Sequence, residues 1–185
     1  LLVFVSIFVI FACSKNEQNV VENVKGEKHL KNVRMLTEVG ENAEAYFSTD
    51  AKKLVFQSTH GEWQCDQIFT MNTDGSDVQL VSTGLGRTTC SYFLPGNDRI
   101  IYASTHEADE ACPKKPDFSR GYVWPVYSTF DLYIANADGS NPQQFLPAPG
   151  YDAEATVSPN GDKIVFTSMR NGDLDIYTVN IDGTD

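Results

Sequence analysis

Positive charge is scarce in this sequence. The 185 residues include 14 Lys and Arg against 25 Asp and Glu, so the formal net charge is −11. A surface with this excess of acid repels phosphate backbones, which argues against nucleic acid as a partner. Long apolar runs are missing as well, because the longest one covers residues 1–12 and is too short to span a bilayer.

Catalytic motifs are also absent. The sequence contains no Gly-x-Ser-x-Gly nucleophile elbow and no glycine-rich phosphate loop. Most of its Asp and Asn residues fall in turn positions, where such side chains cap the backbone. We therefore predict no catalytic residues, no cofactor and no enzymatic activity for this part of the protein.

One strand pattern occurs three times between residues 43 and 185. Each copy has an apolar first strand, an apolar second strand that ends in Ser, and a third strand closed by Asp-Gly-Ser or Asp-Gly-Thr. The second strands are expected at residues 53–58, 99–104 and 163–168, and the closing turns lie at residues 74–76, 138–140 and 182–184. Such a recurrence indicates one structural unit used several times.

The apolar runs in each copy are too short for helices. They are rich in β-branched and aromatic residues, and Gly, Asn, Asp or Pro separates them, which predicts short strands joined by hairpins. Residues 78–81 and 143–146 follow the first two turns and are expected to be fourth strands. Triplets such as Ile164-Val165-Phe166 do not alternate with polar residues, so both faces of each sheet should be buried, as in the blades of a propeller.

The motifs of the repeat point to a known family. They are Phe-Ser-x-Asp at residues 47–50, Lys-apolar-apolar-Phe at 53–56 and 163–166, Ile-Tyr at 176–177 and Asn-x-Asp-Gly-Ser at 72–76. This pattern resembles the WD40-like repeat of the TolB family. The resemblance implies an all-β fold, a β-propeller of four-stranded antiparallel blades. Because propellers have four to eight blades, three repeats predict a fragment of a ring, here expected to have six or seven blades.

The resemblance also gives expected boundaries. Blades are predicted at residues 43–82, 83–148 and 149–185, the last of them incomplete. Residues 33–42 precede the first blade and have the composition of an outermost strand. In TolB-like rings such a strand completes the last blade, so residues 33–42 are predicted to close the ring.

The N-terminal residues predict export. Residues 1–12 have the length of a signal-peptide core with its basic start missing, and Ala12-Cys13-Ser14 resembles a bacterial lipoprotein signal cut before Cys13. We expect a lipid on Cys13 and a polar linker over residues 13–32. The predicted protein is an extracytoplasmic, membrane-anchored lipoprotein of the periplasm or outer membrane. An ordinary secretory peptide or a buried strand is the alternative for residues 1–12.

Three cysteines remain after the predicted anchor, Cys65, Cys90 and Cys112. In an up-and-down blade, the start of the first strand lies at the same rim as the connection between the second and third strands. All three cysteines are therefore expected at one rim, where an oxidising compartment favours a disulfide. We predict Cys90–Cys112, which would tie the long insertion to its own blade, while pairing of Cys65 with either one stays open.

A zinc site is the alternative at this rim. His60 and His106 occupy equivalent positions there, and the segment 106–112 ends in Cys112. However, this segment lacks the second His of the zincin motif and lies in a loop. We favour a structural role in which both histidines fill the place that Arg170 holds in the third repeat, and we predict no metal.

The middle repeat carries an insertion, residues 105–129, that concentrates aromatic residues and Pro. Long ordered loops on a rigid scaffold often carry function. Candidate ligand contacts are Trp63, Tyr122, Trp124 and Tyr127. The alternative is that the insertion only covers the side of its own blade.

Two functions are compatible with these features. The favoured one is a non-catalytic envelope lipoprotein whose propeller binds an envelope protein or a glycan, as the resemblance to TolB implies, and which contacts the membrane only through its lipid anchor. The alternative is the propeller domain of a larger secreted peptidase whose catalytic domain lies beyond residue 185. Chemistry in the propeller channel is weakly indicated, because Glu44, Cys90 and Glu154 lie near the starts of the first strands.

Overall fold

The computed structural model describes Val21 and residues 25–184. It divides into two compact units, Leu1–Glu38 and Val39–Asp185. In the first unit, the Val21 N–H donates to the Val33 carbonyl oxygen over 2.9 Å. The predicted signal at residues 1–12 and the lipid site at Cys13 lie outside the described residues. Both therefore stay predictions.

Residues 33–40 do not form an extended strand. The predicted closing strand at 33–42 overlaps the first blade, because Glu41 and Asn42 already belong to that blade's first strand. Closure of a ring by these residues stays a prediction.

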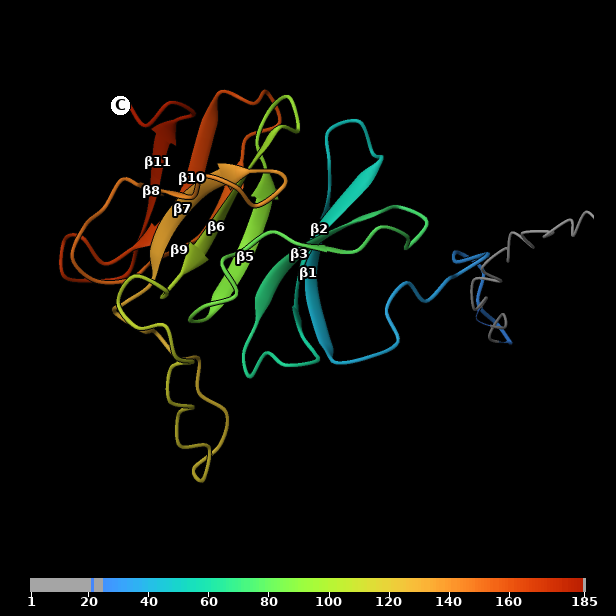
Figure 1. Ribbon diagram of the computed structural model, residues 1–185, viewed down its shortest axis with the longest axis horizontal. Helices are drawn as coiled ribbons and strands as arrows, with labels where there is room; N and C mark the ends of the chain where they lie inside the picture. Colours follow the sequence, from blue (N-terminus) through green and yellow to red (C-terminus); the bar gives the residue numbers. More distant parts are fainter. Residues whose placement is uncertain (1–20, 22–24, 185) are drawn as a thin grey trace, which may run out of the picture. The chain divides into compact units, whose positions relative to one another are not determined.

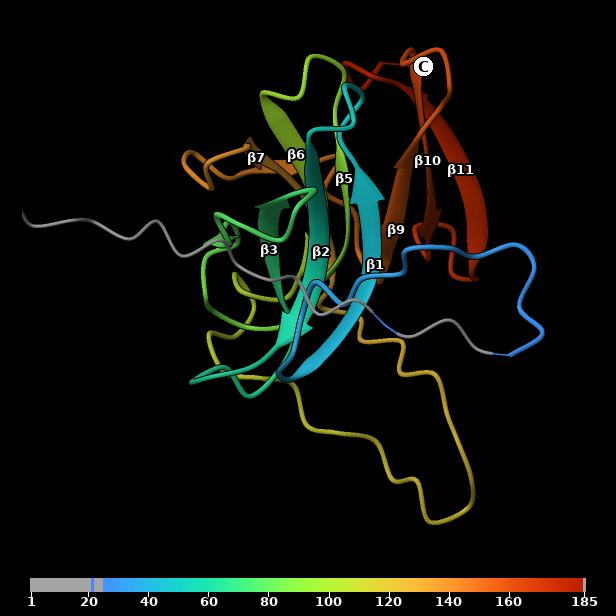
Figure 2. The same cartoon turned by 90° about the vertical axis from the view of Figure 1, so that its right-hand side faces the viewer.

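The second unit consists of three antiparallel sheets that stand side by side in chain order (Figures 1 and 2). The first sheet, blade 1, contains β1 (Glu41–Phe47), β2 (Lys53–Thr59), β3 (Gln67–Asn72) and β4 (Gln79–Leu80). Blade 2 contains β5 (Thr88–Phe93), β6 (Arg99–Ser104), β7 (Asp131–Asn136) and β8 (Gln143–Phe145). Blade 3 contains β9 (Asp152–Val157), β10 (Lys163–Ser168) and β11 (Asp175–Asn180).

The strands in each blade pair in sequence order, so each blade is an up-and-down sheet. The described residues form no helix, and none of them provides a helical span for crossing a membrane. The three predicted repeats and the all-β propeller architecture are therefore confirmed. The fourth strands are shorter than predicted, with two residues in β4 and three in β8.

The apolar second strand of blade 2 is buried on both faces because this blade lies between two neighbours. In β6, Ile100 and Tyr102 pack into the core shared with blade 1, whereas Ile101 and Ala103 pack into the core shared with blade 3. All four side chains have 0% exposed area. Non-alternating apolar strands of this kind are expected where no face meets water.

Each first strand contains one irregularity in its pairing with the second strand. The residues at these points are Glu44, Cys90 and Glu154, with φ of 53°, 52° and 62°. Left-handed backbone is uncommon for residues other than Gly and marks a local constraint. The three repeats thus share a bulge at the same place in the first strand.

The turn that follows the third strand of each repeat requires both its Asp and its Gly. In blade 2, the Asp138 carboxylate accepts from the N–H and hydroxyl of Ser140 over 2.9 and 2.6 Å, and Gly139 has φ of 84°. A Cβ on Gly139 would lie 2.9 Å from the Cα of Val81 at the end of blade 1. Glycine is required there both by the backbone conformation and by close contact with the preceding blade.

Replacing Gly139 by Ala should destabilise the fold more than replacing Gly172 by Ala. Both glycines have positive φ, 84° and 93°, but a Cβ on Gly172 would meet nothing within 4 Å. Gly172→Ala should therefore lose only about 1 kcal/mol for the backbone conformation. Gly139→Ala should lose roughly 1–3 kcal/mol more, because the backbone of Val81 must move. Urea unfolding measures both free energies, and equal losses would refute the proposed contact between blades.

Candidate functional site

The insertion leaves blade 2 between β6 and β7 and extends away from the sheets (Figures 1 and 2). A pocket of about 440 Å³ lies between this segment and all three blades. Its lining combines aromatic side chains of the insertion with polar side chains of the blades, namely Glu41, Gln57, Asp66, Arg87, Thr89, Cys90, Lys115, Pro116, Phe118, Tyr122, Val123, Trp124, Pro125, Tyr127, Phe130 and Tyr151. Such a mixture of apolar walls and a few polar groups is typical of ligand sites.

The wall formed by the insertion contains three of the four predicted contacts, Tyr122, Trp124 and Tyr127. The Tyr127 hydroxyl donates to the Lys114 carbonyl oxygen over 2.9 Å. Burial raises the pKa of Tyr151, which lines the same pocket as Trp124. The Tyr127 hydrogen bond joins two parts of the insertion, and the Tyr127 side chain also packs against the core shared by blades 2 and 3.

The floor of the pocket is polar and is formed by the blades. The side-chain amide oxygen of Gln57 accepts from the Thr89 hydroxyl over 2.6 Å and from the Cys90 N–H over 3.1 Å. Arg87 forms an ion pair with Asp66 over 3.4 Å. Its Nε is buried and has no hydrogen-bond partner among the described residues. The Arg87 side chain is partly exposed, so its guanidinium brings positive charge to the floor of the pocket.

Trp63, the fourth predicted contact, does not line this pocket. Its ring lies 5.7 Å from the ring of His60 and 5.4 Å from that of Phe69, both edge to face. These contacts place Trp63 on blade 1 as a packing residue. This difference could not be predicted, because Trp63 lies in a turn like the other candidates.

The predicted disulfide Cys90–Cys112 is wrong, and the bond is Cys65–Cys112, with a Cα–Cα distance of 5.9 Å. Cys65 lies two residues before β3, in the loop at the rim, whereas Cys90 is the third residue of β5 and lies within the sheet. The bond therefore ties the insertion of blade 2 to blade 1 and not to its own blade. The alternative left open for Cys65 is the observed one.

Cys90 is a free, buried thiol beside a smaller cavity of about 240 Å³. This cavity is lined by the bulge residues of the three first strands and their neighbours, Glu44, Tyr46, Cys90, Ser91, Glu154, Ala155 and Thr156. Burial raises the pKa of Cys90 to about 12. A thiol that stays protonated at neutral pH is a poor nucleophile, so Cys90 is not suited to covalent catalysis.

His60, His106 and Arg170 occupy equivalent places, which confirms the structural interpretation of the histidines. His60 Nδ1 lies 2.9 Å from the Ser58 hydroxyl, and His106 Nδ1 lies 2.8 Å from that of Ser104. Arg170 Nε donates to the Ser168 hydroxyl over 2.8 Å. All three serines have 0% exposed area, so the Ser–His pairs cannot present a nucleophile to a substrate.

The zinc hypothesis does not fit this arrangement. Cys112 is in the disulfide and the ring of His106 lies 4.4 Å from that of Tyr133. Among the described residues, no group of three or more His, Cys, Asp or Glu is placed to hold a metal.

The charge of Arg170 is matched on the neighbouring strand. Its Nη2 lies 3.3 Å from the carboxylate of Asp152, which is almost fully buried. Asp152 pairs with Ser168 in the register, and the equivalent partners of Ser58 and Ser104 are Asn42 and Thr88. Arg thus occurs with Asp, whereas His occurs with an uncharged residue.

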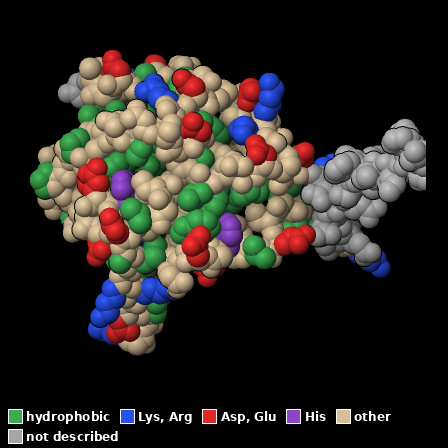
Figure 3. All heavy atoms as spheres, in the orientation of Figure 1, with side chains coloured by type: hydrophobic (Ala, Val, Ile, Leu, Met, Phe, Trp, Pro, Cys, Tyr) green, Lys and Arg blue, Asp and Glu red, His purple; other side chains and the backbone are tan. Residues whose placement is uncertain are grey.

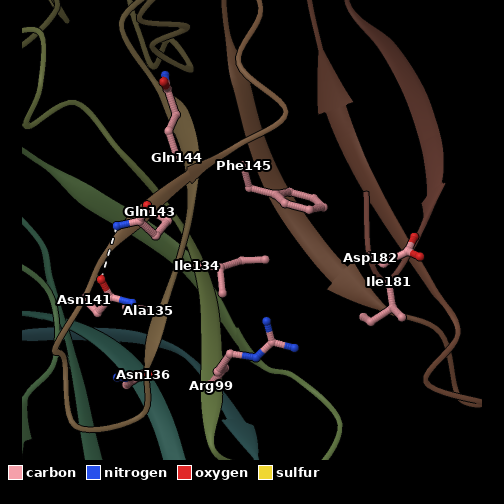
Figure 4. A pocket seen from close by; sticks show the side chains of 10 residues that line it. All are labelled: Arg99, Ile134, Ala135, Asn136, Asn141, Gln143, Gln144, Phe145, Ile181 and Asp182. Carbon is pink, nitrogen blue, oxygen red and sulfur yellow. Dashed lines mark hydrogen bonds between the residues drawn. The ribbon is translucent and has the colours of Figure 1, made fainter. Parts of the chain in front are cut away.

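A second cavity, of about 410 Å³, lies between blades 2 and 3 (Figure 4). Its walls come from β7, β8 and the last turn, with Phe145, Ile134 and Ile181 opposite Arg99 (Figure 4). A Cβ on Gly183 would lie 3.2 Å from the Phe145 ring, so this turn closes one end. None of the residues predicted to bind a ligand lies here.

Removing the disulfide should destabilise the protein. The bond joins residues 47 apart, and loss of such a cross-link by the double change Cys65→Ser and Cys112→Ser should lower the free energy of unfolding by about 2–4 kcal/mol. A non-reducing peptide map should show Cys65 linked to Cys112, with Cys90 alkylated only after unfolding. A Cys90–Cys112 peptide would contradict the structure.

Arg170→Ala should lower the free energy of unfolding by roughly 2–3 kcal/mol, because it leaves the Asp152 carboxylate buried without its partner. This estimate lies below that for a fully buried pair because Arg170 is partly exposed. The double change Arg170→His with Asp152→Asn copies the arrangement of blade 1 and should recover most of the loss relative to Arg170→His alone. Urea unfolding of the parent protein, Arg170→His, Asp152→Asn and the double variant tests this, and additive losses would exclude the coupling.

Comparisons with known proteins agree with the fold. No family model matches the chain. The Tol-Pal system protein TolB of Bordetella pertussis is 42% identical over 55 residues, which are 29% of this chain and 13% of that protein. TolB of Thioalkalivibrio sulfidiphilus is 27% identical over 116 residues, which are 57% of this chain and 27% of that protein. The chain therefore spans less than a third of the length of these curated relatives.

Solved structures give the same architecture. A protein from Agrobacterium tumefaciens assigned to TolB has a TM-score of 0.60 and 19% identity, covering 82% of this chain and 50% of that one. TolB from Acinetobacter baumannii has a TM-score of 0.60 and 17% identity, covering 83% of this chain and 34% of that one. Together with the repeat pattern, these comparisons show that the three sheets are blades of a TolB-like β-propeller.

Proposed function

We propose that this protein is a non-catalytic binding scaffold of the bacterial envelope, and that the pocket beside the insertion holds a segment of an envelope protein or a glycan. The observation that supports this is the lining of the pocket. Aromatic side chains of the insertion face a polar floor that contains Gln57, Thr89 and the partly exposed guanidinium of Arg87. A disulfide fixes the insertion in place, which lowers the entropy lost on binding.

An extracytoplasmic location is part of this proposal. The Cys65–Cys112 disulfide supports it, because such bonds persist mainly in oxidising compartments. The similarity to proteins named for the Tol-Pal system also supports a role in the envelope. A lipid on Cys13 would then hold the propeller near a membrane through the linker at residues 13–32.

The absence of enzymatic activity is likewise proposed. Ser58 and Ser104 are buried beside their histidines, and Cys90 is held protonated, so these side chains are unsuited to nucleophilic catalysis. The alternative, a propeller that restricts access to a peptidase domain, requires catalytic groups in another part of the protein. Sequencing the gene on both sides of the present segment tests that alternative, and a flanking peptidase domain would overturn the scaffold proposal.

The binding role can be tested with one variant and one control. The immobilised chain is presented with solubilised envelope proteins and with a panel of purified envelope glycans. Trp124→Ala removes the largest side chain of the pocket wall and should weaken binding of the captured partner about tenfold or more. Trp63→Phe changes the tryptophan that lies outside the pocket and should leave the affinity unchanged.

Either of two results would refute the role of the pocket. One is a captured partner that binds the Trp124→Ala variant as tightly as the parent protein. The other is the absence of any partner from both sources for a chain whose peptide map shows the Cys65–Cys112 bond. The map makes sure that a negative result is not due to a misfolded insertion.

A further inference from the structure

The outer part of the insertion, residues 113–126 and hereafter the finger, differs in charge from the rest of the chain. It contains Lys114, Lys115 and Arg120 but only one acidic residue, Asp117, so its net charge is +2. The whole chain has a net charge of −11. In Figure 3 the projecting segment shows Lys and Arg side chains close together, whereas Asp and Glu are scattered over the rest of that face.

The finger also exposes apolar and aromatic side chains. Tyr122 is 77% exposed and Trp124 is 60% exposed, and the other exposed apolar residues of the finger are Phe118, Val123 and Val126. The rings of Phe118 and Tyr122 stack with 6.2 Å between their centroids. A contiguous exposed patch of this kind on a projecting segment indicates a surface that becomes covered.

The combination of aromatic rings and basic groups indicates what kind of partner the finger binds. Trp and Tyr side chains prefer the boundary between water and lipid, because they have an apolar body and a polar end. Lys and Arg beside them are attracted to anionic headgroups. We propose that the finger docks onto a membrane surface that carries anionic phospholipid. This contact is additional to the predicted lipid anchor at Cys13, and it shares Phe118, Tyr122 and Trp124 with the lining of the pocket.

A soluble acidic polymer fits the finger less well. Such a partner would bind to Lys114, Lys115 and Arg120 but would leave Phe118 and Tyr122 in water. A membrane surface satisfies both sets of side chains at once. It also fits the position of the finger, which projects beyond the blades in both ribbon views (Figures 1 and 2).

The base of the finger is suited to hold this surface in a defined direction. Cys112, which immediately precedes the finger, is bonded to Cys65 of blade 1, and the Tyr127 hydroxyl donates to the Lys114 carbonyl oxygen. The Gly86 N–H donates to the Glu110 carbonyl oxygen over 2.7 Å. The finger is therefore tied to blade 1 at its N-terminal end, and at its C-terminal end Tyr127 packs against the core of blades 2 and 3, while its middle stays exposed.

The two tryptophans of the chain make the test specific. In a Trp63→Phe variant the only indole is that of Trp124, in the finger, and in a Trp124→Phe variant it is that of Trp63, on blade 1. Vesicles of phosphatidylcholine with phosphatidylglycerol should shift the Trp124 emission to shorter wavelength and leave the Trp63 emission unchanged. Vesicles of phosphatidylcholine alone should give a much smaller shift. The tryptophan signal is needed because the apolar residues 1–12 can bring the chain to vesicles by themselves.

Charge removal gives a second measure. Lys114→Gln with Lys115→Gln should weaken binding to phosphatidylglycerol vesicles about 30-fold, since each basic group contributes roughly fivefold. Lys52→Gln with Lys163→Gln is the matched control, because both lysines lie on the blades outside the finger, and it should weaken binding by less than threefold. Phe118→Ser with Tyr122→Ser should abolish the Trp124 shift. All these side chains of the finger are exposed, so the variants are expected to fold, and the disulfide map checks this.

Two outcomes would overturn the proposal. In the first, the folded chain shows no Trp124 shift with phosphatidylglycerol vesicles. In the second, a soluble polyanion such as dextran sulfate binds with the same dependence on Lys114 and Lys115 and prevents vesicle binding, and Phe118→Ser with Tyr122→Ser has no effect. The finger would then be a site for acidic polymers.

Discussion

Packing of each blade against its neighbours is the interaction on which the remaining structure depends. Strand β6 shows it most directly, since Ile100 and Tyr102 are buried against blade 1 while Ile101 and Ala103 are buried against blade 3. The Asp-Gly turns extend this contact to the outer edge, because Gly139 lies against the end of blade 1 and Gly183 against β8 of blade 2. Where no neighbour lies, as on the outer face of blade 3, Ile176 is 79% exposed. The same sequence pattern therefore encodes both the strands and the spacing between blades.

The candidate site is a consequence of this spacing. Because packing fixes blades 1 and 2 relative to each other, Cys65 and Cys112 from different blades come within bonding distance. The bond carries the insertion across the boundary between these blades, so that its aromatic residues face Gln57 and Arg87. The pocket and the projecting finger thus lie on one side of the blades, where the other repeats have only short connections between their strands. The rigid blades hold the insertion in place, and the insertion supplies the aromatic side chains of the candidate site.

The sequence predicted the blades well because their pattern is local and repeated. Strand type, hairpin order and burial of both faces follow from triplets such as Ile164-Val165-Phe166 and from the Asp-Gly turns. The disulfide partner was predicted wrongly because the depth of Cys90 in β5 cannot be seen in a strand pattern, and its left-handed bulge becomes visible only in the backbone. Trp63 was misplaced for a similar reason, since its contacts with His60 and Phe69 depend on side-chain packing within blade 1. The pairing of Arg170 with Asp152 could have been found by aligning the three repeats and comparing the charges at these two positions.

The central claim is that the blades are held by their own packing while the insertion depends on the Cys65–Cys112 bond. Hydrogen exchange measured before and after reduction of the protein tests it most directly. The account predicts that amides of residues 105–129 exchange rapidly once the bond is reduced, while those of β2, β6 and β10 keep strong protection. Loss of protection in β2 and β6 together with the insertion would contradict it, because the disulfide would then be holding the blades themselves.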